Sequence, residues 1–96
     1  MEIKKEINGE QAVISLNGWL DTKSAPDFEA RLASLPVDVT SLTLDLAELE
    51  YISSAGLRQV VAAHKKMNGN LTIINVSDEI KELFRMAGFD KKLNIQ

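Results

Sequence analysis

Two adjacent serines are the residues of this chain best placed to take part in chemistry. Ser53 and Ser54 stand directly before Ala55-Gly56, at the start of a helical pattern. Apolar positions then recur at the three-and-four spacing of one helix face, at Leu57, Val60, Val61, His64 and Met67. We therefore expect one of the serines to be the N-cap of this helix, with its hydroxyl beside the unpaired amides of the first turn. A serine there would be exposed and would tolerate negative charge.

Nucleophilic catalysis by either serine is not expected, because the sequence offers no general base. His64 is the only histidine, and it should point to the core from most of three turns into the helix. The chain has no glycine-rich phosphate loop and no nucleophile elbow. It also has no cysteine, hence no thiolate, disulfide framework or zinc-finger spacing. The sequence predicts a protein that is not an enzyme, with no catalytic residue, metal site or cofactor.

The composition predicts one soluble globular domain over residues 1–96. The chain is 45% apolar and 26% charged, as in ordinary folded proteins. Its formal net charge of -3 and its scattered lysines and arginines argue against nonspecific nucleic-acid binding. The sequence begins without the apolar core of a signal peptide and has no run of membrane-spanning length. We therefore expect a cytoplasmic protein without membrane insertion.

The first third of the chain predicts two strands followed by a helix. Asn8-Gly9 is a strong hairpin signal, which places a strand before it and a second strand over 12–16. A turn is expected over 17–21. Ser24 should begin the helix, in a capping box with Asp27, and Pro36 should end it. The buried stripe of this helix is predicted at Phe28, Leu32 and Leu35.

The remainder predicts alternating strands and helices. A central strand over 42–46 leads through a loop to the helix of the serine pair, which Asn68-Gly69 ends. A strand over 71–76 precedes a helix capped by Ser77, and the pattern allows a short last strand over 93–95. The buried face of that helix is predicted at Ile80, Leu83, Phe84 and Ala87. The order β-β-α-β-α-β-α(-β) indicates an α/β fold with a mixed, mostly parallel sheet of four to five strands and about three helices.

Three segments of the chain resemble one protein family. They are Gly18-Trp19-Leu20-Asp21, the stretch from Asp45-Leu46 through Tyr51-Ile52-Ser53-Ser54-Ala55-Gly56-Leu57-Arg58, and the closing segment 76–89 with Leu83-Phe84 and Ala87-Gly88-Phe89. Together they resemble the STAS family, the sulphate-transporter and anti-sigma-factor-antagonist domains, over nearly the whole chain.

The resemblance implies a phosphorylation-switched binding module, an anti-sigma factor antagonist. Its unmodified form would sequester an anti-sigma factor that is also a serine kinase and so free a sigma factor. Phosphorylation would end this capture, and a metal-dependent PP2C-type serine phosphatase would reset it. The family's acceptor, two residues before the glycine, falls on Ser54, with Ser53 as the less favoured alternative. The implied partner surface comprises Asp21, Ser53, Ser54, Gly56, Leu57 and Arg58.

Several alternatives remain open. The chain could be a non-switching STAS subunit of a lipid-transport ATPase assembly or a signalling scaffold, with Ser54 only capping its helix. A small-ligand or nucleotide-binding module is a weaker alternative, because no phosphate-cradling loop is present. Asp21 could repel a phosphate or contact a basic partner, or it could be a turn residue that bonds its local backbone. Trp19 could anchor a partner or cover one end of the core.

Overall fold

The structure, a computed structural model that describes residues 1–96, is built on one mixed β-sheet. Its elements are β1 (Glu2–Asn8), β2 (Gln11–Leu20), α1 (Ala25–Ala33), β3 (Ser41–Ile52), α2 (Ser54–Lys66), β4 (Leu71–Ile74), α3 (Asp78–Met86) and β5 (Asn94–Ile95). The strands lie in the sheet in chain order; β1 and β2 are antiparallel, and every later pair is parallel. The predicted α/β class and element order are confirmed, including the last strand.

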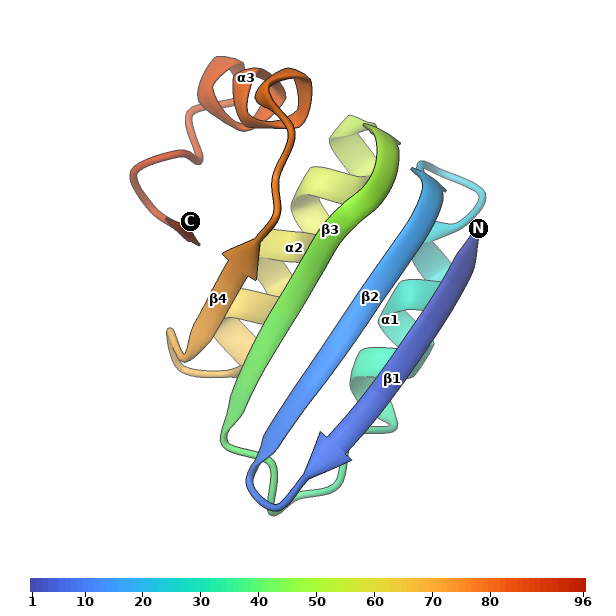
Figure 1. Ribbon diagram of the computed structural model, residues 1–96, viewed down its shortest axis with the longest axis vertical. Coiled ribbons are helices and arrows are strands. Elements are labelled where there is room, and N and C mark those ends of the chain that lie inside the picture. The colour runs from blue at the N-terminus through green and yellow to red at the C-terminus, as the bar shows by residue number, and fades with distance from the viewer.

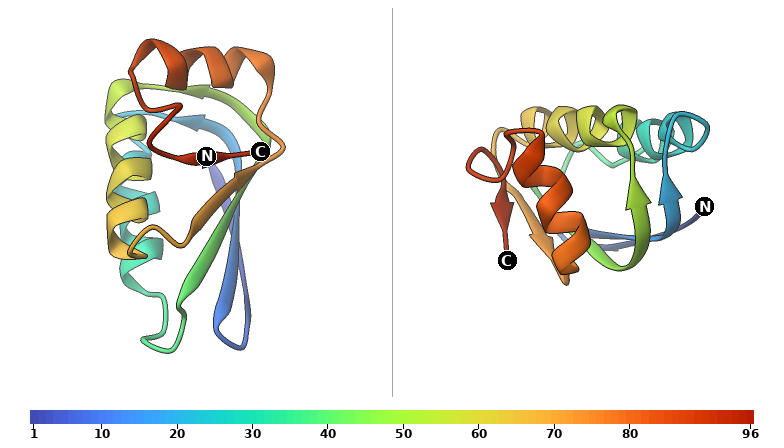
Figure 2. Two further views of the ribbon diagram at one scale, coloured as in Figure 1. Left: turned by 90° about the vertical axis from the view of Figure 1, so that its left-hand side faces the viewer. Right: turned by 90° about the horizontal axis from the view of Figure 1, so that it is seen from above.

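Two of the three helices cover a single face of the sheet. Figures 1 and 2 show α1 and α2 side by side on that face, each crossing over between neighbouring parallel strands. Helix α3 instead lies across the end of the sheet where the parallel strands finish (Figure 2). The opposite face of β1 and β2, here called the open face, carries exposed side chains such as Val13 and Asn17. The core therefore lies between the sheet and the α1–α2 layer.

One cluster of 23 buried side chains forms this core. Phe28, Leu32 and Leu35 contribute to it, as the helical stripe predicted. From the last helix, Ile80 and Phe84 are fully buried and Leu83 is half-buried, but Ala87 is exposed. The prediction for Ala87 is wrong because α3 ends at Met86, so that Ala87 begins the turn leading to Gly88, whose φ is +81°.

The central strand is much longer than the sequence predicted. Strand β3 continues beside β2 to Ile52, and the predicted loop at 47–52 and turn at 17–20 are both strand. Two register shifts give β3 an extra residue each time, which widens the spacing of its buried side chains to three at Leu46, Leu49 and Ile52. The alternation of buried and exposed residues in β3 thus ends at Leu46, although its pairing with β2 continues to Ile52. The predicted strand end was wrong because it relied on that alternation.

The helix caps agree with prediction in two cases of three. The Ser77 hydroxyl accepts a hydrogen bond from the Ile80 amide, as expected for the N-cap of α3. Ser24 precedes α1, but it forms no capping box with Asp27. Its hydroxyl donates to the Trp19 carbonyl instead, 2.7 Å away, because the chain turns sharply between β2 and α1. At the C-terminal end of α2, Asn68 at φ +53° and Gly69 at φ +87° stop the helix as predicted.

Candidate functional site

The ends of β2 and β3 bring the two candidate segments together. Leu20 and Ile52 are paired residues of parallel strands, so Asp21 and Ser53 both follow directly at the same edge of the sheet. The Ser53 amide donates to the Leu20 carbonyl over 2.9 Å, which ties the two chain exits to each other. Asp21 therefore lies at the same end of the sheet as the serines, as a partner surface that includes both requires.

The two serines have different surroundings. Ser53 is the N-cap of α2, and its half-buried hydroxyl accepts a hydrogen bond from the Gly56 amide over 3.2 Å. Ser54 is the first residue of the helix and is exposed, and its hydroxyl makes no hydrogen bond within the chain. The interpretation of Ser54 as a helix cap is therefore wrong: Ser53 fills that role and leaves the Ser54 hydroxyl free.

Gly56 fixes how closely α2 approaches the sheet. A Cβ atom at this buried position would lie 2.5 Å from the Leu20 carbonyl oxygen and 2.8 Å from a side-chain carbon of Ile52. Both distances are shorter than real Cβ contacts, so the close packing of the helix on β2 and β3 requires glycine. The backbone that approaches Gly56 is thus that of its own chain, and Gly56 supports the surface from below rather than forming part of it.

Asp21 organises the turn that follows β2. One of its carboxylate oxygens accepts hydrogen bonds from the Lys23 amide at 3.0 Å and the Ser24 amide at 3.1 Å, and it lies 3.1 Å from the Ser24 hydroxyl oxygen. These donors, the Ser24 amide above all, hold the pKa of Asp21 below its ordinary value. The carboxylate therefore remains ionised at neutral pH and serves the local turn; its second oxygen has no partner in the chain.

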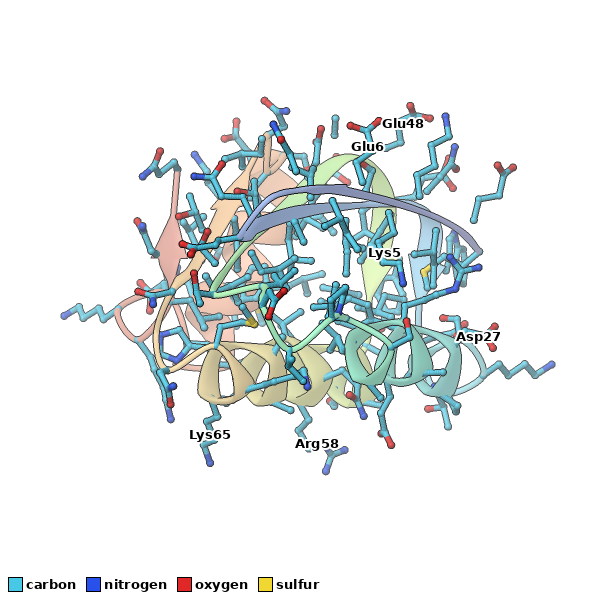
Figure 3. All side chains as sticks on the ribbon, turned by 90° about the horizontal axis from the view of Figure 1, so that it is seen from below. Lys5, Glu6, Asp27, Glu48, Arg58 and Lys65 are labelled. Atoms are coloured by element: carbon cyan, nitrogen blue, oxygen red, sulfur yellow. The ribbon has the colours of Figure 1, made fainter.

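A groove of about 380 Å³ lies beside the exposed serine. We call it the Ser54 groove; its walls are Ser54, Leu57, Arg58, Ala87 and Phe89, so α2 and the turn after α3 face each other across it. Figure 3 shows Arg58 projecting from the outer side of α2. Arg58 is the one charged side chain among the lining residues. The groove thus combines three apolar side chains, a hydroxyl and a single positive charge.

Only some of the residues predicted for the partner surface lie together in the structure. Ser54, Leu57 and Arg58 line one groove, Gly56 lies beneath it, and Asp21 occupies the neighbouring turn. Sequence reasoning missed Ala87 and Phe89, which it assigned to the buried face and the end of the last helix. The only sequence signal for these two residues was their place in the closing segment that resembles the family. That signal did not indicate that they lie opposite α2.

The remaining chemistry-bearing residues do not join this site. His64 is half-buried near the far end of α2, with Gly69 its close neighbour. No three His, Cys, Asp or Glu side chains are grouped so that they could hold a metal ion. None of the helices has the length and apolarity that crossing a membrane requires.

Comparisons with known proteins connect this geometry to a family. The family model described as "Mlab, STAS domain" matches residues 3–95. BtrV of Bordetella bronchiseptica, a candidate anti-sigma factor antagonist, is 33% identical over 81 residues, which are 80% of this chain and 70% of BtrV. The anti-sigma-B factor antagonist of Bacillus subtilis is 28% identical over 98 residues, covering 99% of this chain and 88% of that protein.

A solved structure has the same fold. The phosphorylated form of SpoIIAA, a Bacillus cell fate determinant, superimposes with a TM-score of 0.76 at 20% identity, covering 99% of this chain and 91% of SpoIIAA. Because the family model matches residues 3–95, from β1 to β5, this protein belongs to the STAS domain family.

Proposed function

We propose that this chain is an anti-sigma factor antagonist that is switched by phosphorylation of Ser54. In its unmodified form it would bind an anti-sigma factor serine kinase at the Ser54 groove and free a sigma factor. The proposal rests on the different roles of the two serines. Ser53 caps α2, and the exposed Ser54 hydroxyl is left without a hydrogen bond beside the groove. The names of BtrV and of the Bacillus subtilis relative support the antagonist part of this proposal.

A phosphoryl group suits this position without unfolding the domain. Ser54 is the first residue of α2, where a negative charge gains roughly 0.3–1 kcal/mol from the helix end when exposed. Arg58, one helical turn further on, lines the same groove. Phosphorylation would therefore leave the domain folded, and its cost would fall on the complex, where a dianion enters a packed interface. A serine phosphatase of the PP2C type would restore the binding form.

Mass spectrometry tests the acceptor directly. The protein would be incubated with ATP, magnesium and the anti-sigma factor kinases of its own cell, and intact and peptide masses would be measured. One phosphoryl group on Ser54 is expected, absent in Ser54→Ala. The matched control is Ser53→Ala, which removes the neighbouring hydroxyl and should still be modified at Ser54. Phosphate on Ser53 in the unmodified sequence would contradict the assignment.

Binding measurements test the switch. Ser54→Ala should bind the kinase as tightly as the unmodified protein, because the hydroxyl has no partner to lose within the chain. Ser54→Asp should bind at least tenfold more weakly, since about 1.4 kcal/mol of charge repulsion or desolvation in the interface suffices for that factor. Equal affinity of the two variants would refute the switch even if Ser54 is phosphorylated.

A second function is favoured by the shape of the site. The Ser54 groove is lined mainly by Leu57, Ala87 and Phe89, so a partner could dock there without any phosphate. In that case the chain would be a non-switching STAS subunit of a larger assembly. Failure of every candidate kinase to modify Ser54, together with loss of a stable complex in Leu57→Asp, would favour this function over the first.

A further inference from the structure

The chain's single tryptophan and single tyrosine form an exposed pair on the side of β3 that faces away from the helices. Trp19 and Tyr51 are paired residues of β2 and β3, with ring centroids 5.4 Å apart and ring planes tilted by 54°. Their neighbours Leu20 and Ile52 are buried against the helix layer, so the aromatic rings point to the open face. Trp19 is 56% exposed and Tyr51 42%. The fold uses neither ring in its core.

Acidic side chains surround this pair. A Glu50 carboxylate oxygen accepts from the Trp19 indole N–H over 3.3 Å, and a Glu48 oxygen accepts from the Asn17 amide over 2.7 Å. Each carboxylate keeps its other oxygen without a donor in the chain. Neither carboxylate forms an ion pair, because the only ion pair in the protein joins Glu82 and Arg85. The Glu50 carboxylate therefore holds the indole at its edge, and Glu48 lies two residues earlier in the same strand.

An acidic hollow continues the same surface along the open face. It has a volume of about 120 Å³, and its charged lining residues are Glu2, Asp45, Glu48 and one cation, Lys4. Asn17 also lines it and lies two residues before Trp19 in β2, so the hollow and the aromatic pair share one face. Figure 3 shows Glu48 on the side of the sheet opposite the helices. Three carboxylates against one ammonium give this hollow a negative potential.

We propose that the Trp19–Tyr51 pair and the acidic hollow form a second docking site, which binds an arginine-bearing segment of a partner protein. An arginine side chain stacks on an aromatic face, and its planar fork of donors matches a carboxylate. Here the aromatic face and the unbonded oxygens of Glu48 and Glu50 occur together. The negative potential disfavours nucleic acid and anionic lipid at the same place. The site lies on the other face of β3 from the groove and does not depend on Ser54.

The site carries its own reporter, because Trp19 is the only tryptophan of the chain. A short peptide with two arginines would be titrated into the full chain while tryptophan emission is followed. The same peptide with citrulline, a neutral isostere of arginine, is the matched ligand control. We expect saturable emission changes with the arginine peptide and an affinity for the citrulline peptide that is about threefold to tenfold lower.

Charge-matched variants distinguish binding at this site from nonspecific attraction between the cationic peptide and the negatively charged protein. Glu48→Gln with Glu50→Gln should weaken arginine-peptide binding by about threefold to tenfold. Asp38→Asn with Glu79→Gln, which changes the net charge equally at exposed positions away from the hollow, should leave it unchanged. Ser54→Ala should also bind the peptide normally, so the outcome is separate from that of the phosphorylation proposal.

Three results would overturn the proposal. One is the absence of saturable binding up to millimolar arginine peptide. Another is equal affinity for the arginine and citrulline peptides, which would mark an apolar contact without charge recognition. The third is self-association in sedimentation velocity that Trp19→Ala abolishes, which would make a second copy of the chain the occupant.

Discussion

Because Ser53 caps α2 and Ser54 does not, alanine substitution of the two serines should change the folding stability by different amounts. Ser53→Ala removes the acceptor of the Gly56 amide and leaves a half-buried backbone donor unpaired at the start of α2. Losing an N-cap hydroxyl costs about 1 kcal/mol in the free energy of unfolding. For a domain of this size, that corresponds to a fall in Tm of about 4–8 °C. Ser54→Ala removes a hydroxyl without any partner in the chain and should change the unfolding free energy by less than about 0.5 kcal/mol.

The assay is thermal and urea unfolding followed by circular dichroism, with the two alanine variants measured beside the parent chain. Ser53→Asp is the control, because aspartate also caps helices and should restore most of the lost stability. A stability loss in Ser54→Ala equal to that in Ser53→Ala would refute the reasoning, since it would mean that Ser54 holds the helix terminus. So would an unchanged Tm in Ser53→Ala. Either result would also remove the structural basis for Ser54 as the free hydroxyl.

Three further outcomes follow from the packing and charges of the same region. Gly56→Ala should lower the unfolding free energy by about 1–3 kcal/mol in urea titrations, because the new methyl group would overlap the Leu20 carbonyl; an unchanged or raised stability would contradict the close approach. Asp21 has a depressed pKa, so its stabilisation is present above the usual carboxyl value of 3.8 and is lost as the pH falls through the folded-state pKa. Unfolding curves should therefore separate the parent from Asp21→Asn at neutral pH and converge in acid, and a gap independent of pH would be inconsistent with that. Phe84→Ala should cost about 3–5 kcal/mol, because Phe84 is fully buried and anchors α3 to the core; native-state hydrogen exchange would show whether α3 loosens first.

Much of the fold could be predicted from the sequence because its signals are local. The Asn8-Gly9 turn, the cap by one residue of the serine pair, the cap at Ser77 and the stop at Asn68-Gly69 depend on the conformation of a few neighbouring residues. The helical and alternating apolar patterns then fix which faces are buried, and a strand–helix–strand order leaves few topologies. Those signals place the serine pair at the carboxyl end of a central strand without reference to any tertiary contact.

The features that were predicted wrongly from the sequence depend on contacts with residues far away along the chain. β3 extends to Ile52 because β2 pairs with it through two bulges, and a bulge breaks the apolar period that marks a strand. Which serine keeps a free hydroxyl follows from the geometry of one capping hydrogen bond. The groove requires the turn after α3 to meet α2, and the aromatic pair requires the register that sets Trp19 beside Tyr51. Local patterns thus determined the elements and the serine motif, whereas long-range pairing decided which side chains share a surface, because that choice depends on contacts between residues distant in the sequence.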